Sequence, residues 1–287
     1  MSFILFARAL GMEVVDLTPS DRVRRCATAT HPRKKNGAYM WDGSRGWVFD
    51  WAGEARTHWY QDPNAQPWTD SEKRMWAIRR QQEVQSRERA YENAALKADV
   101  LLRSATTGTH NYLALKGFPD ERAFIGQDGA LLVPMRSLSG QLQGLQVIRW
   151  IEADRRYEKK MLTGMRAKGA VFRLGMPKAA ETFLVEGYAT GLSVRAALQS
   201  VGLRGAVLVC FSAGNLVHVA PQVTGRLFVF ADNDASGAGE RAAVNTGLPY
   251  CMSDAVGEDA NDLHKRAGLM AVVAKLMTAR RQERAMA

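Results

Sequence analysis

The last third of the chain alternates between short apolar runs and stretches with helical spacing. Continuous apolar runs of this length are typical of parallel strands that helices cover on both faces. The pattern therefore predicts an α/β fold with a doubly wound C-terminal domain over residues 181–287, which ends in a helix. The apolar runs cover residues 182–186, 206–211 and 226–232, and the helical stretches cover 190–200 and 236–246.

The first 66 residues show a different pattern, in which aromatic residues alternate on either side of a glycine-containing turn. Residues 37–41 and 47–51 flank that turn, which predicts a β-hairpin within a small β-rich region. Prolines then mark a linker at 61–69. Residues 71–103 contain neither glycine nor proline, so we predict a long charged helix that serves as a solvated spacer rather than a binding element.

Between this helix and the C-terminal pattern lies a segment that reads as a basic α+β subdomain. Residues 130–135 and 142–149 look like two antiparallel strands joined by a turn around Gly140. We therefore predict four parts: a β-rich region at 1–66, a helical connector at 67–108, the basic subdomain at 109–180 and the α/β domain at 181–287.

Composition indicates a folded protein with a polyanionic partner. Of the 287 residues, 46% are hydrophobic and 24% are charged, which is close to the average for globular domains. Lys and Arg number 39 against 29 Asp and Glu, so the net charge is +10. Residues 21–35 and 149–178 carry this excess. Such a balance favours nucleic acid or nucleotide phosphate as the partner.

The cysteines and the hydropathy indicate the cellular compartment. Cys26, Cys210 and Cys251 form neither a disulfide framework nor a Cys-x-x-Cys metal motif, so we expect a reducing cytoplasm. No stretch approaches the roughly 18 apolar residues that span a bilayer. The start of the chain also lacks a signal-peptide pattern. We therefore expect no association with membranes.

Three carboxylates follow the predicted strands. Glu186 ends the first apolar run, and Asp232 and Asp234 end the third. Ligands of open parallel sheets bind at the carboxyl edge, and residues two apart on an extended segment point the same way. Oxygen ligands that converge without Cys or His suit Mg²⁺ bridged to substrate phosphates. We therefore predict a cation site, although any one acid could instead cap the next helix.

A second acidic group, Asp259 and Asp262, follows a short apolar piece at residues 249–252. These side chains could extend the cation site. They could equally cap the last predicted helix.

At this point the motifs resemble a known family. The pairing of "FLVEGY" at 183–188 with "FADND" at 230–234 resembles the Toprim domain of bacterial-type primases, topoisomerases and some nucleases. "VEGYATGLS" at 185–193 looks like the EGYATG motif of primases encoded by phages and conjugative plasmids, and "FSAGNL" at 211–216 is similar to their second-strand motif. The segments at 112–118, 131–148 and 159–164 also look like the region before Toprim in that group.

The resemblance implies a DNA primase that synthesises short RNA primers on single-stranded DNA from ribonucleoside triphosphates, for phage or plasmid replication in a bacterial cytoplasm. It implies that Asp232 and Asp234 bind Mg²⁺ or Mn²⁺, and that Glu186 is a further ligand or the proton acceptor. Asp259 and Asp262 resemble trailing acidic positions of the family. Two cations about 4 Å apart would activate the primer hydroxyl and neutralise the leaving pyrophosphate.

Basic side chains should complete such a site, because carboxylates alone repel nucleotide and template. We expect a group of them to bind phosphates with an affinity that falls as salt rises, although each one could be a solvated surface charge. Asn215 in "FSAGNL" could contact nucleotide or cap a turn. The basic candidates are Arg149, Arg155, Arg156, Lys159, Lys160, Arg166 and Lys168.

The amino-terminal region departs from the family pattern. Primases of this type often carry a zinc ribbon there, whereas this region offers Cys26, His31 and His58 without paired cysteines, so we expect no zinc. Its aromatic and basic side chains could stack and bind single-stranded DNA, or the rings could form a small core. The candidates for DNA contact are Arg33, Lys34, Lys35, Trp41 and Trp47.

Two other functions stay open. A Toprim nuclease would use the same metals, and the match before Glu186 argues against it. A non-catalytic single-stranded-DNA-binding replication adaptor would gain nothing from acids that face phosphate. A topoisomerase would need a large strand-passage domain, for which the chain has no room. The chain also has no room for a helicase domain, so we expect a separate helicase partner, or a truncated or accessory role for this protein.

Overall fold

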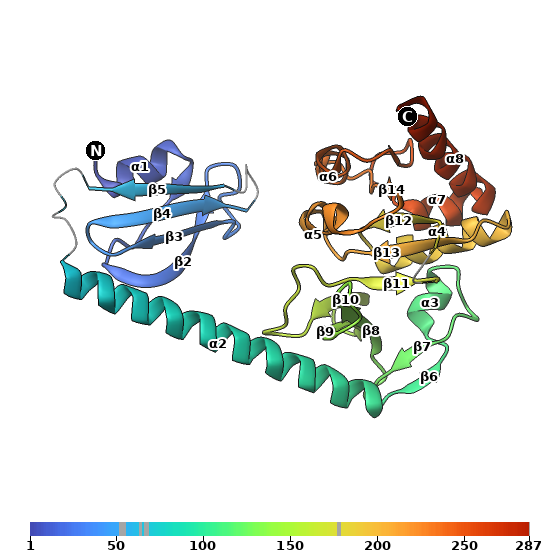
Figure 1. Ribbon diagram of the computed structural model, residues 1–287, viewed down its shortest axis with the longest axis horizontal. Coiled ribbons are helices and arrows are strands. Elements are labelled where there is room, and N and C mark those ends of the chain that lie inside the picture. Colours follow the sequence, from blue (N-terminus) through green and yellow to red (C-terminus); the bar gives the residue numbers. More distant parts are fainter. Residues whose placement is uncertain (52–55, 63–64, 66–68, 177–178, 287) are drawn as a thin grey trace. The chain divides into compact units, whose positions relative to one another are not determined.

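The computed structural model describes the chain except residues 52–55, 63–64, 66–68, 177–178 and 287 (Figure 1). The chain forms two compact units, Met1–Arg80 and Gln81–Ala287. Within the described ranges, no helix combines the length and the apolar character that a membrane span requires. The predicted fold class is confirmed: along the chain, a β-rich region and a long helix precede an α/β C-terminal domain.

The first unit is an antiparallel sheet with the strand order β1-β2-β3-β4-β5. The predicted hairpin is present, with Tyr39 of β3 paired to Val48 of β4. A short helix at the start was not predicted, because residues 1–66 read as strands and turns. The elements are α1 (Phe3–Ala9), β1 (Met12–Glu13), β2 (Ser20–Thr28), β3 (Gly37–Trp41), β4 (Arg45–Asp50) and β5 (Thr57–Gln61).

Aromatic rings form the core of this sheet. The Trp41 ring stacks on Phe3 with 4.8 Å between centroids and 10° between planes, and it lies 5.7 Å from the ring of Tyr60. Phe3, Tyr39 and Tyr60 are buried. Trp41 is half-buried and packs against this core, which favours the core interpretation of this ring over base stacking.

The predicted long helix is α2 (Asp70–Arg103). It begins with a reciprocal cap, since the Glu72 carboxylate accepts the Thr69 N–H at 2.7 Å and the Thr69 hydroxyl accepts the Glu72 N–H at 3.3 Å. Ala94 and Ala98 are its buried residues, and both contribute to clusters with the following sheet. Most other described side chains of the helix are polar and exposed, with some exposed apolar ones such as Trp76 and Leu96, and its role as a spacer stays a prediction.

The second unit contains two sheets. The antiparallel sheet has the order β10-β9-β8-β7-β6, and the mainly parallel sheet has the order β11-β13-β12-β14-β15. The first sheet comprises β6 (Thr106–Gly108), β7 (Ala123–Ile125), β8 (Leu131–Arg136), β9 (Leu142–Ile151) and β10 (Arg156–Met161), with α3 (Asn111–Leu115). The second comprises β11 (Phe172–Leu174), β12 (Glu181–Val185), β13 (Gly205–Val209), β14 (Arg226–Phe230) and β15 (Tyr250–Cys251).

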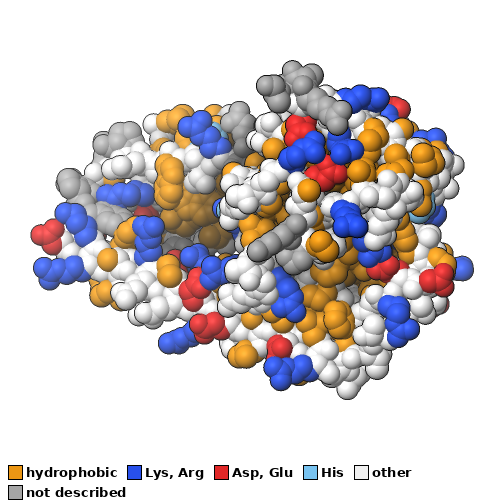
Figure 2. Space-filling model, turned by 45° about the vertical axis from the view of Figure 1, so that its right-hand side comes forward, with side chains coloured by type: hydrophobic (Ala, Val, Ile, Leu, Met, Phe, Trp, Pro, Cys, Tyr) orange, Lys and Arg blue, Asp and Glu red, His pale blue; other side chains and the backbone are white. Residues whose placement is uncertain are grey.

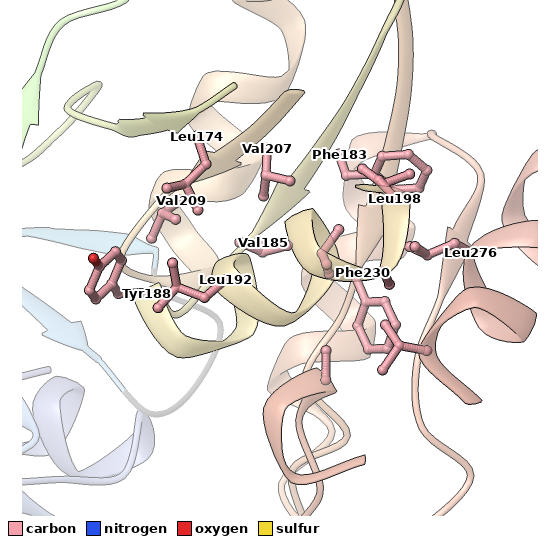
Figure 3. Packing of buried hydrophobic residues seen from close by; sticks show 14 of the residues in the cluster. Leu174, Phe183, Val185, Tyr188, Leu192, Leu198, Val207, Val209, Phe230 and Leu276 are labelled. Carbon is pink, nitrogen blue, oxygen red and sulfur yellow. The ribbon is translucent and has the colours of Figure 1, made fainter. Parts of the chain in front are cut away.

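Helices cover both faces of the parallel sheet, because alternate residues of each strand point to opposite sides. Phe183 and Val185 of β12 pack with α4, α7 and α8, whereas Leu184 packs with α5 and α6. Figure 3 shows the first face, where Val185 lies beside Leu192 of α4. The helices are α4 (Tyr188–Ser200), α5 (Ala213–Val219), α6 (Ala238–Thr246), α7 (Ala260–Ala267) and α8 (Leu269–Met286), with a 3₁₀ turn at Ala220–Gln222.

The two sheets of this unit share one core and several buried polar links. Leu113 and Ile148 of the antiparallel part belong to the same apolar cluster as Phe183. The fully buried Asn261 of α7 donates to the Lys116 carbonyl at 2.7 Å. Arg195 of α4 and Glu121 form a two-point ion pair. The basic subdomain is therefore fixed to the edge of the parallel sheet.

Asn215 provides another such link. Its Oδ1 accepts the Gly169 N–H at 2.7 Å, and its Nδ2 donates to the carbonyls of Ala170 and Cys210, both at 2.8 Å. The side chain is buried. The structure thus gives Asn215 a packing role between α5 and the basic loop at residues 165–170, and a contact of Asn215 with nucleotide stays a prediction.

Replacing Asn215 by alanine should lower the free energy of unfolding by about 3 kcal/mol, because three backbone groups lose their partner. Chemical denaturation measures this. Asn245→Ala, at an exposed position of α6, is the matched control and should change stability far less. Equal losses in the two variants would contradict the role of the buried amide.

Candidate active site

Loops at the carboxyl edge of the parallel sheet carry the predicted acids. Glu186 directly follows β12, the central strand. Asp232 and Asp234 follow the neighbouring strand β14, and the two strands end level because Val185 pairs with Phe230. The sequence placed these three residues at one edge, and the strand order makes them neighbours.

A third loop is attached to the same edge. The Gly257 N–H donates to the Asn233 carbonyl at 2.6 Å, and the Asn233 N–H donates to the Glu258 carbonyl at 3.2 Å. These bonds hold Asp259, the next residue, beside the segment that carries Asp232.

Asp232 is the central group of the cluster. Its Oδ1 is buried and has no hydrogen-bond partner among the described residues. Burial raises the pKa of Asp232 to about 7, with smaller contributions from three acids, while a lysine opposes the rise. Three neighbouring carboxylates therefore oppose the ionisation of Asp232. The acids that raise this pKa are Asp259, Glu186 and Asp234, and the lysine is Lys159.

Glu186 has a similar environment. Burial raises its pKa, and the charge of Asp234 adds to the rise. A hydrogen bond from the Ala213 N–H, at the start of α5, and the charge of Lys159 act in the opposite direction. Burial therefore disfavours the charged form of both Glu186 and Asp232.

Asp234 is the acid that stays charged most easily. Its carboxylate accepts the N–H groups of Ser236 at 2.9 Å and Gly239 at 2.8 Å, and also the Ser236 hydroxyl. These bonds, the one from the Ser236 hydroxyl first, lower its pKa to about 2. The capping role that the sequence left open is present here, and the charge of the same carboxylate also acts on Glu186.

Asp259 and Asp262 form a capping box at the start of α7. Asp259 Oδ1 accepts the N–H groups of Asn261 at 2.7 Å and Asp262 at 2.8 Å. Asp262 accepts the Asp259 N–H at 3.5 Å. Asp259 also acts on Asp232, so it belongs to both arrangements, whereas the contacts of Asp262 are those of a helix cap.

The cluster offers a divalent cation an incomplete set of ligands. In the part of the chain that is described, no three His, Cys, Asp or Glu side chains lie close enough to hold a metal ion as they stand. The buried Asp232 oxygen without a partner nevertheless fits a cation. So does the concentration of carboxylates, since oxygen ligands suit Mg²⁺.

One of the predicted basic residues reaches this cluster. The Lys159 Nζ lies 5.6 Å from the centre of the Tyr112 ring, and its charge lowers the pKa of both Glu186 and Asp232. Because Lys159 is an exposed residue of β10, its ammonium group can contact a ligand bound at the acids.

The other basic candidates are engaged elsewhere or lie on loops. Ion pairs join Arg149 to Asp128, Arg156 to Asp154, Lys160 to Glu158 and Arg166 to Glu88. Arg155 occupies a left-handed turn conformation (φ 47°) between β9 and β10, and Lys168 lies on an exposed loop. On the face in Figure 2, Lys and Arg side chains are scattered, several beside acidic ones. Exposed pairs of this kind are weak, so phosphate can compete for the cations.

The amino-terminal candidates divide into two groups. Arg33, Lys34 and Lys35 line a hollow of about 600 Å³. Trp41 is half-buried against the core, and Trp47 is half-buried opposite Trp59. The rings that protrude most are Trp51 and Trp59, which are 61% and 73% exposed. Trp59 was missed, because it lies outside the hairpin that the pattern marked.

Gly239 is a second residue that sequence reasoning missed. A Cβ added there would lie 2.1 Å from the Asp232 carbonyl oxygen. The close approach lets α6 reach the acidic segment and lets the Gly239 N–H bind Asp234. The glycine pair in "SGAG" at 236–239 is the only sequence signal for it.

Comparison with known proteins agrees with part of the sequence expectation. Residues 181–269 match the model of the Toprim domain, which includes all five predicted acids. The comparison with curated proteins gave no match.

Two solved structures are distantly similar. One is a chain in the structure of the bacteriophage T7 lagging-strand DNA polymerase interacting with primase domains of two gp4 subunits bound to an RNA/DNA hybrid and dTTP. Its identity is 14%, with a TM-score of 0.42, over 60% of this chain and 92% of that one. The other is the DnaG catalytic core, with 18% identity and a TM-score of 0.35 over 52% of each chain.

Replacing Gly239 by alanine should destabilise the protein by about 2 kcal/mol, because the new methyl group meets backbone that cannot rotate away. Denaturation in EDTA measures the loss. Gly214→Ala is the control, since a Cβ at that helical position meets nothing within 4 Å. A Gly239→Ala protein as stable as the control would show that α6 does not need this close approach.

The raised pKa of Asp232 predicts a pH dependence of stability in EDTA. Folding favours its neutral form, so its contribution is present below pH 4 and is lost as the pH rises toward 7. Asn mimics the neutral acid, so Asp232→Asn should become more stable than wild type, on the order of 2 kcal/mol, by pH 8.

Denaturation at several pH values measures this difference, with the exposed Asp120→Asn as control. A difference between Asp232→Asn and wild type that stays constant from pH 4 to 8 would contradict the assignment of a buried carboxyl whose Oδ1 has no hydrogen-bond partner among the described residues.

Proposed function

We propose that the protein is a DNA primase that synthesises short RNA primers on single-stranded DNA by metal-dependent nucleotidyl transfer. The acidic cluster carries this proposal: Asp232 holds a buried oxygen to which none of the described residues donates, and three further carboxylates act on Asp232 within a Toprim domain. The primase-type motifs at 112–118, 131–148, 159–164 and 185–193 favour synthesis over the other Toprim activities.

The residues that would hold Mg²⁺ or Mn²⁺ are Glu186, Asp232 and Asp234, with Asp259 at the margin. When bound, one or two such ions lower the pKa of a hydroxyl nucleophile and neutralise the leaving pyrophosphate. This role explains why a carboxyl as poorly solvated as Asp232 stands at the strand end. Asp262 is a helix cap in this scheme rather than a ligand.

The chain's own groups position the reactants. Lys159 faces the acids and can bind a nucleotide phosphate by a charge-assisted hydrogen bond. Glu186, whose pKa is raised, is suited to accept the proton of the primer hydroxyl, or it serves as a further ligand. The loosely paired cations of the basic subdomain, Arg149, Arg155, Arg156, Lys160, Arg166 and Lys168, can follow phosphates of nucleotide or template.

We assign the four predicted parts accordingly. Residues 181–287 provide the acids, 109–180 the phosphate-binding surface and 67–108 a connector. In residues 1–66, the hollow lined by Arg33, Lys34 and Lys35 is a template-binding surface, with exposed rings such as Trp51 and Trp59 taking the stacking role first considered for Trp41. The setting is the cytoplasm of a bacterial host, with replication of a phage or plasmid and a separate helicase as partner.

A primer-synthesis assay with labelled ribonucleotides on single-stranded DNA tests the proposal. Asp232→Asn and Asp234→Asn should each reduce product at least about 100-fold, because they weaken the hold on the cations that stabilise the transition state. Asp120→Asn, an exposed acid outside the cluster, should retain full activity.

The same reactions separate the alternatives. Metal-dependent degradation of the template without primers would replace the proposal by a Toprim nuclease. Tight DNA binding with neither activity would replace it by a replication adaptor. Primer synthesis that survives both substitutions would show that the cluster is not the active site.

A further inference from the structure

A second hollow, of about 410 Å³, lies on the antiparallel sheet of the second unit, and the acidic cluster does not line it. Volumes of this size are typical of sites for small ligands or parts of larger ones. The hollow is bounded by the β9–β10 hairpin, the start of α3 and the turn before β8. Its lining includes Thr109, Asn111, Gly129, Arg149, Trp150 and Tyr157.

Two aromatic rings form one wall. Trp150 of β9 pairs directly with Tyr157 of β10, and their rings lie 5.1 Å apart at 65°. The indole is 45% exposed, yet its Nε1 is fixed by a 2.6 Å hydrogen bond to Glu152. An exposed ring that is held in one orientation is a prepared surface for stacking.

Two polar lining residues have free hydrogen-bonding capacity. Both ring nitrogens of His110 are already hydrogen-bonded: Nδ1 accepts the Tyr112 N–H and Nε2 bonds to the Gly129 carbonyl, both at 3.0 Å. By contrast, the exposed side chains of Thr109 and Asn111 make no hydrogen bond with any described residue. An amide and a hydroxyl can each donate to or accept from the edge of a planar heterocycle.

Three cations lie at separate places on the same hairpin. Arg149 lies at the rim, in an exposed 2.5 Å ion pair with Asp128 that a phosphate can replace. Arg155 is at the turn, and Lys159 of β10, on the face opposite to Arg149, acts on the acids. Cations spread out in this way suit a sugar-phosphate chain, whereas a free triphosphate requires cations gathered at one point.

We propose that this hollow binds one unstacked base of single-stranded DNA. The base stacks on Trp150, Thr109 and Asn111 meet its edge, and Arg149 binds the adjoining phosphate. The inference deepens the proposed function, on which it rests for the identity of the strand as template. The ring contacts from Trp150 through Tyr157 to Tyr112, and the contact of Tyr112 with Lys159, connect the hollow to the acidic cluster.

Fluorescence anisotropy of a labelled oligo-dT with the full chain, in EDTA and without nucleotides, tests this site. Trp150→Ala should weaken binding about tenfold, the effect of losing one base–aromatic stack. Trp150→Phe should restore most of the affinity. Phe124→Ala is the matched control, because Phe124 is an exposed ring (39%) on the same sheet outside the hollow.

A second measurement distinguishes a strand from a free nucleotide. Binding of a fluorescent ribonucleoside triphosphate in Mn²⁺ should be the same for wild type and Trp150→Ala. Unchanged oligo-dT affinity in Trp150→Ala, an equal loss in Phe124→Ala, or a loss confined to the free nucleotide would each overturn the proposal. The DNA-binding assay contains neither metal nor nucleotide. The base site can therefore be confirmed even if primer synthesis is not observed, and primer synthesis can be confirmed even if the base site is not.

Discussion

The structure depends on the repulsion between carboxylates that meet at the end of a parallel sheet. Glu186, Asp232 and Asp234 follow two adjacent strands, and Asp259 is tied to the same edge by backbone hydrogen bonds. Burial and mutual charge raise the pKa values of Glu186 and Asp232. An arrangement that destabilises its own charged form calls for a cation, and this requirement links the fold to phosphoryl chemistry.

The surrounding elements hold the acids in place against that repulsion. The amides at the start of α6 bind Asp234, and Gly239 brings that helix against the backbone of Asp232. On the opposite face of the sheet, Phe183 and Val185 pack with α4, α7 and α8. Buried links such as Asn215 attach the basic loop to this scaffold, so Lys159 and the acids belong to one compact unit.

Much of this could be predicted from the sequence. Apolar runs followed by acids predicted the strands and the edge at which Glu186, Asp232 and Asp234 lie, because strand period and strand ends are local signals. The packing of Trp41 against the core and the packing role of Asn215 depend on contacts distant in sequence, so the pattern left both open. The short helix α1 and the hollow beside Trp150 were missed, since both arise from how segments pack rather than from local spacing.

The most direct test is a crystal structure of the protein grown with Mn²⁺, in which anomalous scattering locates the ion. The account predicts a peak in contact with the Asp232 oxygen that has no protein partner, and with at least one of Glu186 and Asp234. Well-ordered acids without a peak at saturating Mn²⁺, or Mn²⁺ bound only elsewhere on the protein, would contradict it.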